Sequence, residues 1–164
     1  MLTFTPISLY GPGDLSALIK KSYAALVGEC PEYWEPEAEK WEEFDRQAFA
    51  HPNTIGKYVF ISGFGGRPIG LASYDPRREP RYGLIGQNCI LPEYQGRGFG
   101  GMQILEILRR FREDQTRAAH VTTSAHPFFA PAIRMYERLG FKEIRRFPGG
   151  PDPRYGIIEL RLEL

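Results

Sequence analysis

Apolar and polar positions follow several different patterns along the chain. Residues 3–9 predict a strand, and the segment Gly-Pro-Gly-Asp at 11–14 then supplies the turn and cap residues that start helices. Apolar side chains recur near helical spacing over 15–27, which predicts a helix with one face packed on a sheet. A second helix is predicted at about 37–49, after two prolines interrupt the chain.

Strand-forming residues dominate the middle of the chain. Residues 57–62 and 68–74 are rich in them, and the glycine-rich segment 63–66 between the two predicts a hairpin turn. Another strand is predicted at 82–91. A glycine-rich turn at 92–101 follows it, so the chain runs from a strand through a tight turn toward a helix.

Helical and strand patterns alternate in the last third of the chain. Apolar residues at helical spacing over 102–111 predict a helix, and residues 120–124 predict a short buried strand. A proline suited to a first helical turn opens the helix predicted at 131–139. Residues 141–144 and 155–162 predict the closing strands.

The order of these elements indicates the class of fold. Antiparallel strand pairs lie beside one parallel strand–helix–strand crossover, which predicts a mixed α+β sheet with helices on both faces, in α/β/α layers. The chain has 164 residues, of which 42% are hydrophobic. This length predicts a single domain over residues 1–164 with a core of its own.

Composition and charge exclude several classes of protein. Lys and Arg number 21 against 20 Asp and Glu, so the net charge of +1 gives no electrostatic footprint for nucleic acid. No apolar run approaches membrane-spanning length and the N-terminus lacks the pattern of a secretory leader, which predicts a cytoplasmic protein with no membrane partner. Cys30 and Cys89 fit neither a CxxC pair nor a Cys/His cluster, so we expect buried apolar roles and no metal.

The candidate chemistry begins at the glycine-rich turn. Glycines at a strand-to-helix junction let the main chain curl tightly and bring bare N–H groups to one point. Those groups are the unpaired amides of the first helical turn, at the positive end of the helix dipole, so the turn should hold an anion such as pyrophosphate. The expected cofactor-binding residues of the turn are Gln95, Gly96, Arg97, Gly98, Phe99, Gly100 and Gly101.

A dinucleotide site is one interpretation of this turn, because Gly96, Gly98 and Gly101 match its glycine spacing. That site also needs an acidic residue about 20 positions further on, to hold the ribose. Residues 120–124 contain no carboxylate. A nicotinamide-dependent oxidoreductase is therefore disfavoured.

Two segments together resemble the GNAT N-acetyltransferases. The pyrophosphate motif of that family, Gln/Arg-x-x-Gly-x-Gly/Ala, matches residues 95–100. A second recurrent block of the family places a tyrosine four residues before Gly-Phe, and Tyr136 stands in this way before Gly140 and Phe141. The resemblance covers residues 82–144 well and implies the GNAT-like acyl-CoA N-acyltransferase fold.

The resemblance also implies an activity, the transfer of an acetyl group from acetyl-CoA, a co-substrate, to a primary amine by direct attack. It assigns pantetheine binding to the backbone at Cys89 and Ile90, where the strand is expected to splay from its parallel neighbour. It makes Tyr136 the general acid, because a phenol with an ordinary pKa of about 10 is protonated at neutral pH and can donate to a departing thiolate.

The general base is left open between three alternatives. Many relatives carry a glutamate on the strand before the turn, but residues 86–89 contain no carboxylate. Gln87 or Asn88 could orient a water, His126 could act directly because imidazoles titrate near neutral pH, or the amine could arrive already neutral. An asparagine that often contacts CoA in this family is replaced by Phe129.

Charge is distributed unevenly along the chain. Residues 29–45 carry eight acids and one lysine among aromatic residues, whereas residues 97–146 carry ten basic and five acidic residues. We expect the acidic segment to attract a cationic amine, either a small molecule or a peptide. Arg97, Arg134 or Arg138 could help to hold CoA phosphates. A homodimer is left open, and the alternative function is a non-catalytic module that binds acyl-CoA.

Overall fold

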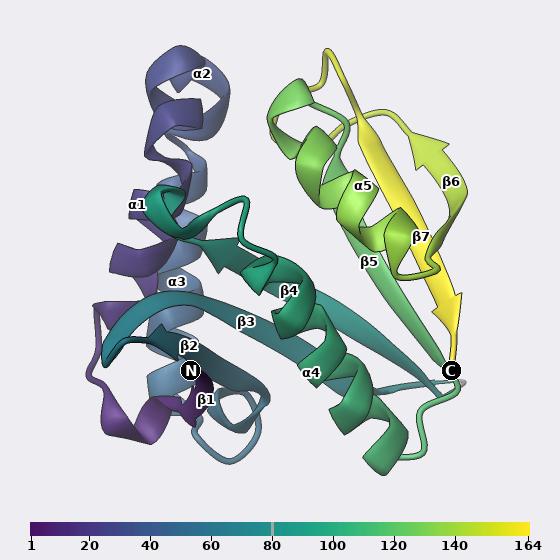
Figure 1. The fold of residues 1–164 in the computed structure, drawn as a ribbon. Helices are drawn as coiled ribbons and strands as arrows, with labels where there is room; N and C mark the ends of the chain where they lie inside the picture. The colour runs from purple at the N-terminus through teal and green to yellow at the C-terminus, as the bar shows by residue number, and fades with distance from the viewer. Residues whose placement is uncertain (80) are drawn as a thin grey trace. The chain divides into compact units, whose positions relative to one another are not determined.

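The computed structural model describes residues 1–79 and 81–164. The strands form one seven-stranded sheet in the order β1-β2-β3-β4-β5-β7-β6 (Figure 1). Strands β4 and β5 are parallel, whereas the pairs β1–β2, β2–β3, β5–β7 and β6–β7 are antiparallel. The predicted mixed α+β fold is confirmed.

The elements follow one another closely in the chain. The strands are β1 (Leu2–Pro6), β2 (Val59–Phe64), β3 (Arg67–Arg78), β4 (Tyr82–Ile90), β5 (Ala118–Ser124), β6 (Lys142–Phe147) and β7 (Ile157–Glu163). The helices are α1 (Asp14–Glu29), α2 (Pro31–Trp34), α3 (Glu37–Ala50), α4 (Phe99–Glu113) and α5 (Ala130–Arg138). Short 3-10 helices are η1 (Ile7–Leu9), η2 (Gly56–Tyr58), η3 (Pro92–Tyr94) and η4 (Pro127–Phe129).

The main differences from the predicted elements lie at their ends. The strand predicted at 3–9 stops at Pro6, because the next residues form the 3-10 turn η1. The hairpin turn predicted at 63–66 is shorter, since β2 continues through Phe64. Only Gly65 and Gly66 turn the chain there, with φ of 59° and 77°, a region that glycine adopts without strain.

The chain forms two compact units, each built from two segments. The first unit comprises residues 1–73 and 87–99, and the second comprises residues 74–86 and 100–164. Strands β3 and β4 contribute residues to both. The prediction of one domain stays a prediction.

In the first unit, helices α1 and α3 pack on the strands. Most of their predicted apolar positions are buried in one cluster with strand residues, and each fully buried leucine or isoleucine contributes about 1.5–3 kcal/mol to folding. The buried members of this cluster include Leu15, Leu18, Ile19, Trp41, Ala48, Val59, Ile61, Leu71, Cys89 and Leu91. A smaller cluster is formed by Ile69, Ile90 and Phe99.

The start of α1 is stabilised by a side chain from α3. Gly13, at the N-cap position, has a φ of 97° and no side chain with which to cap the helix. The buried carboxylate of Asp45 accepts the N–H of Gly13 at 2.8 Å and the N–H of Ser16 at 2.9 Å. Asp14, from the predicted cap segment, accepts the N–H of Gly11 at 2.8 Å instead. Two of the orphan amides of α1 are thus satisfied by a distant residue.

In the second unit, helix α4 packs closely on β4. Phe111 is fully buried, and its ring meets the Tyr74 ring edge-on at 5.6 Å. A Cβ at Gly83 would lie 2.4 Å from the Phe111 ring, so only glycine lets the strand approach the helix this closely.

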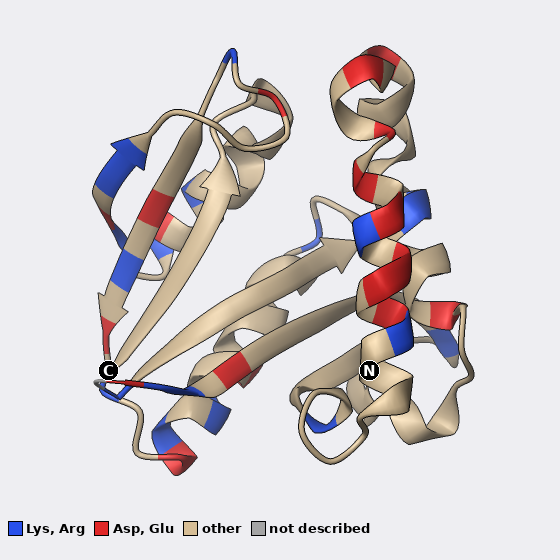
Figure 2. Ribbon diagram, turned by 180° about the vertical axis from the view of Figure 1, so that it is seen from behind, with Lys and Arg blue, Asp and Glu red and all other residues tan. Residues whose placement is uncertain are grey.

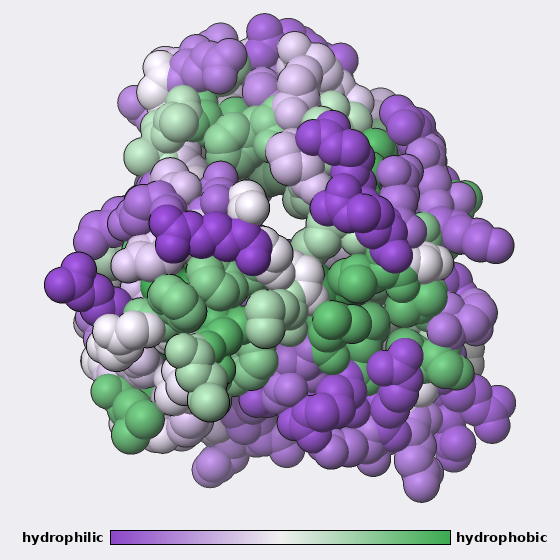
Figure 3. Space-filling model, in the orientation of Figure 1, coloured by the Kyte–Doolittle hydropathy of each residue, from purple (hydrophilic) through white to green (hydrophobic). Residues whose placement is uncertain are grey.

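The described surface is mixed in polarity. Figure 3 shows separate apolar patches among hydrophilic side chains on the face seen there. Met102 and Leu105 of α4 are 45% and 52% exposed, which is ordinary for single surface residues. Among the described residues, no helix combines the length and apolar character needed to cross a bilayer.

Candidate functional site

The candidate pyrophosphate site begins where β4 ends. The side chain of Gln95 folds back onto the strand, and its Nε2 donates to the carbonyl oxygen of Ile90 at 2.8 Å. Its backbone N–H donates to the carbonyl oxygen of Pro92 at 3.2 Å. Gln95 therefore stabilises the turn by bonding back to the strand. The carbonyl oxygen of Ile90, which is predicted to bind pantetheine, already accepts one intramolecular hydrogen bond.

Two glycines give the turn its backbone conformation. Gly96 and Gly98 have φ of 74° and 83°, and a Cβ at either would meet no atom within 4 Å. Glycine is required there for its backbone freedom rather than for space. Among the described residues, the N–H groups of Gly96, Arg97 and Gly98 donate to no backbone carbonyl. The first amides of α4 follow directly, so several unpaired donors gather at the positive end of this helix.

The side chains of the residues next to these amides contact other parts of the first unit. Phe99 is buried, and its ring packs on the Phe64 ring at 5.0 Å, which anchors the first residue of α4 in the core. Arg97 donates from Nη2 to the carbonyl oxygen of Glu93 at 3.2 Å and lies over the Tyr94 ring at 5.5 Å. The backbone of the turn is thus exposed, while Phe99 fixes the start of α4 in the core. This arrangement fits a diphosphate.

Helix α5 packs beside the first turn of α4. A Cβ at Gly100 would lie 3.7 Å from Sδ of Met135, and one at Gly101 would lie 3.7 Å from its Cγ. These are ordinary van der Waals contacts, so alanine would fit and longer side chains would push the helices apart. The two sequence blocks that carry the family resemblance therefore meet in the second unit at Met135.

Tyr136 follows Met135 on α5 and is only 4% exposed. Its ring meets the Phe141 ring edge-on at 5.4 Å. The helix ends at Gly140, whose φ is 98°, and the N–H of Phe141 donates to the Tyr136 carbonyl oxygen at 3.0 Å. The Tyr-x-x-x-Gly-Phe block is thus a helix C-terminus that holds the tyrosine ring in place.

These features agree with a comparison against known families. Residues 21–141 match the family described as "Acetyltransferase (GNAT) family". The chain belongs to the GNAT acetyltransferase family. The resemblance inferred from the two sequence blocks is confirmed, since the match spans both of them.

Solved structures share the fold of this GNAT chain across nearly its whole length. A structure described as a GNAT-family acetyltransferase from Desulfovibrio desulfuricans has a TM-score of 0.76 at 20% identity and covers 99% of each chain. The PaiA N-acetyltransferase from Thermoplasma acidophilum, in complex with coenzyme A, has a TM-score of 0.74 at 12% identity and covers 100% of this chain and 99% of its own. A Salmonella typhimurium structure with acetyl-CoA has a TM-score of 0.71 at 19% identity and covers 99% and 93%.

A curated relative is closer in sequence but much longer. The histone acetyltransferase type B catalytic subunit of Candida glabrata is 32% identical over 95 residues. The alignment covers 57% of this chain and 24% of that subunit. The chain therefore spans only about a quarter of this relative's length.

The end of β4 in this GNAT chain carries Asn88 and Cys89. Burial raises the pKa of the Cys89 thiol to about 11, so it is a core residue and not a nucleophile. The half-buried Asn88 accepts the Tyr23 hydroxyl on its carbonyl oxygen at 3.4 Å. Gln87 donates its backbone N–H to the Ser73 hydroxyl at 2.7 Å. Strand β4 contains no carboxylate along its described length.

His126, a candidate base, is 5% exposed and caps the 3-10 helix η4. Its Nδ1 accepts the N–H of Phe128 at 3.0 Å, and its own N–H donates to the Ser124 hydroxyl at 3.1 Å. The ring also meets the Tyr155 ring edge-on at 4.8 Å. A backbone N–H can only donate, so Nδ1 carries no proton here, and accepting one would break the cap.

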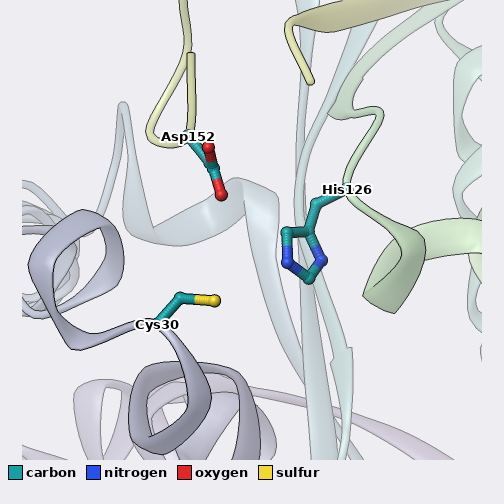
Figure 4. Close-up of side chains that lie close together, drawn as sticks. All are labelled: Cys30, His126 and Asp152. Atoms are coloured by element: carbon teal, nitrogen blue, oxygen red, sulfur yellow. The ribbon is translucent and has the colours of Figure 1, made fainter. Parts of the chain in front are cut away.

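Asp152 was not singled out by the sequence, although it lies beside His126. Figure 4 shows both side chains, and a ring nitrogen of His126 lies within 4.8 Å of a carboxylate oxygen of Asp152. Asp152 is fully buried, and Arg154 donates to it from Nη2 at 2.7 Å and from Nε at 2.9 Å. These bonds, with a smaller effect of His126, hold the pKa of Asp152 below its ordinary value. Only the fold reveals this pair, because 26 positions in the numbering separate the two residues.

The acidic segment is partly internal. Asp45, Trp34 and Trp41 are buried, so not all of its acids and aromatic rings reach the surface. Acids that pair with basic residues are Glu37 with Lys40, Glu42 with Lys20 and Glu43 with Arg46. Among the described residues, four exposed glutamates of this segment form no ion pair: Glu29, Glu32, Glu35 and Glu39. Figure 2 shows acidic residues in red along the helices of this part of the chain.

The predicted site residues divide between the two units. The first unit holds Asn88, Cys89, Ile90, Gln95, Gly96, Arg97, Gly98 and Phe99, and the second holds Gly100, Gly101, His126 and Tyr136. Within the second unit, Met135 joins the Gly100 turn to the helix of Tyr136. Within the first, Gln95 joins the turn to Ile90.

Proposed function

We propose that this chain transfers the acetyl group of acetyl-CoA to a primary amine. The observation that carries the proposal is the turn at 96–98, where two glycines with positive φ leave backbone amides unpaired at the start of α4. Such a turn suits the diphosphate of coenzyme A. Structural relatives described with acetyl-CoA or coenzyme A bound support the same co-substrate.

The reaction needs a positioned amine and a proton for the leaving sulfur. The amine nitrogen forms a bond to the thioester carbonyl carbon, the carbon–sulfur bond breaks, and the amine loses one proton. We assign the proton for the thiolate to the Tyr136 hydroxyl, which solvent then reprotonates. Holding both reactants in place supplies the remainder of the acceleration.

For the proton on the amine, we favour an acceptor that arrives neutral or a water oriented by Asn88 or Gln87. The Nδ1 of His126 is engaged by the Phe128 N–H, which argues against direct proton abstraction by this ring. The exposed carboxylates of the acidic segment favour an acceptor that carries further positive charge. That acceptor is a small molecule or a peptide amine.

The first test is binding and turnover with the wild-type chain. Acetyl-CoA at about 100 times its Kd should raise the Tm by about 5 °C, because ligand binding to the folded state stabilises it. A panel of mono- and polyamines should then release free coenzyme A thiol. Binding without thiol release across the panel would instead favour the non-catalytic acyl-CoA module. The absence of a carboxylate on β4 is an observation in favour of that alternative.

Gly98→Val tests the turn against a matched control. The substitution should lower affinity for acetyl-CoA by about tenfold or more, because valine resists a φ of 83° and would displace the amides. Gly66→Val introduces the same strain at a φ of 77° in the β2–β3 hairpin and should leave affinity unchanged. Equal affinity for all three proteins, measured by calorimetry, would remove the turn from the binding site.

A further inference from the structure

The turn between β5 and α5 is held by several hydrogen bonds. The N–H of Ala125 donates to the carbonyl oxygen of Gly156 at 3.0 Å, which joins the turn to the start of β7. The carbonyl oxygen of His126 accepts the N–H of Phe129 at 2.9 Å, while its Nδ1 accepts that of Phe128. One residue therefore satisfies two consecutive amides just before α5 begins at Ala130.

Two groups from the β6–β7 connection lie beside the ring of this residue in the second unit. The Tyr155 ring meets the imidazole edge-on at 4.8 Å, and a carboxylate oxygen of Asp152 lies within 4.8 Å of a ring nitrogen. Arg154 donates to that carboxylate from Nη2 at 2.7 Å. Asp152 is itself fixed, because its carbonyl oxygen accepts the N–H groups of Tyr155 at 3.2 Å and Gly156 at 3.4 Å.

We infer that His126 is a positioning residue for Tyr136. Its Nδ1 accepts the Phe128 N–H and so fixes the start of the η4–α5 segment. The far end of this segment carries Met135, which packs on Gly100 and Gly101, and then Tyr136. A change in the orientation of α5 would therefore move the Tyr136 hydroxyl relative to the start of α4. This inference rests on the proposed transferase function, with Tyr136 as the acid.

Two substitutions of His126 distinguish a role as hydrogen-bond acceptor of the turn from a role as general base. His126→Asn places Oδ1 where Nδ1 stands, and asparagine accepts an N–H two residues on as readily as any side chain. His126→Ala removes the acceptor. His126→Ala should lower kcat by about tenfold with an unchanged KM for acetyl-CoA, and His126→Asn should return kcat to within about twofold of wild type.

The conservative variant decides whether the hydrogen-bond acceptor at this position is what matters. If His126→Asn were as slow as His126→Ala, the positioning role would be wrong.

Hydrogen exchange in the ligand-free protein keeps this test independent of activity. His126→Ala should accelerate exchange of the Phe128 amide and of the first turn of α5 by about tenfold, and His126→Asn should not. Unchanged exchange in His126→Ala would overturn the inference even if the enzyme is active. Altered exchange in a chain that transfers no acetyl group would instead overturn the proposed function and leave the cap intact.

Discussion

At the scale of single residues, the glycines of this chain serve different physical needs. Gly98 is needed for its positive φ, whereas Gly83 and Gly70 are needed for space: a Cβ at Gly70 would lie 2.2 Å from the carbonyl oxygen of Cys89. Gly100 lies in a helix with room for one methyl group. The glycine-rich motif therefore contains positions of unequal tolerance, and Gly100→Ala should be far milder than Gly98→Val.

Tyr136→Phe tests the acid at the same scale. The substitution removes only the hydroxyl and keeps the ring that packs on Phe141. We expect kcat to fall by about tenfold or more, because the departing thiolate loses its proton donor, with affinity for acetyl-CoA nearly unchanged. Steady-state kinetics with calorimetric binding measures both.

Phe141→Leu is the control for packing around the tyrosine, because it alters the ring contact and keeps the hydroxyl. Phe141→Leu should lower the free energy of unfolding and change kcat little. Unchanged turnover in Tyr136→Phe would exclude Tyr136 as the acid.

At the scale of elements, α1 depends on α3 for its start. Asp45 accepts two N–H groups at the beginning of α1, and its side chain is buried. Asp45→Ala should lower the free energy of unfolding by about 2 kcal/mol, because both amides lose their acceptor. Asp45→Asn retains one acceptor oxygen and should lower it by about half as much. Urea unfolding at neutral pH measures the two values.

Asp14→Asn is the matched control for the cap of α1. Asp14 stands at the same helix end, but it is exposed and accepts only the N–H of Gly11. We expect a change of about 0.5 kcal/mol or less. An equal effect of Asp14→Asn and Asp45→Ala would contradict the interhelical cap.

At the scale of the whole molecule, carboxylates paired with arginines make stability depend on acid pH. Hydrogen bonds from Arg109 and then Arg110 lower the pKa of Glu106 from 4.5 to about 2. A pKa that is lower in the folded state stabilises the fold fully above the unfolded value, and the contribution is lost as the pH falls through the folded value. This contribution is therefore present above about pH 4.5 and disappears toward about pH 2.

Glu106→Gln should accordingly lower the free energy of unfolding by about 1 kcal/mol at pH 7. The difference from wild type should shrink between about pH 4.5 and pH 2, as followed by urea unfolding at a series of pH values. Glu113→Gln removes an exposed partner of the same Arg109 and should change stability little. A pH-independent deficit in Glu106→Gln would rule out the ion pairs as its cause.

Much of this molecule follows from signals that are local in the sequence. Helix α3 was predicted at 37–49 and spans Glu37–Ala50, because apolar periodicity needs no distant partner to be seen. The turn at 95–101 and the Tyr136 block were recognised in the same way, and the family match confirms the resemblance they carried.

The partners of the polar groups were decided only by the tertiary structure. The sequence predicts Asp45 as one acid of a segment that attracts a cation and Gln95 as a phosphate ligand. In the structure, Asp45 caps helix α1 and Gln95 donates to the carbonyl oxygen of Ile90. His126 became a cap because Phe128 donates to it, and the nearby carboxylate of Asp152 comes from the β6–β7 connection. Periodicity records which side of an element faces the core, whereas hydrogen bonding depends on distance and angle between particular atoms. Those quantities exist only once the segments have been brought together.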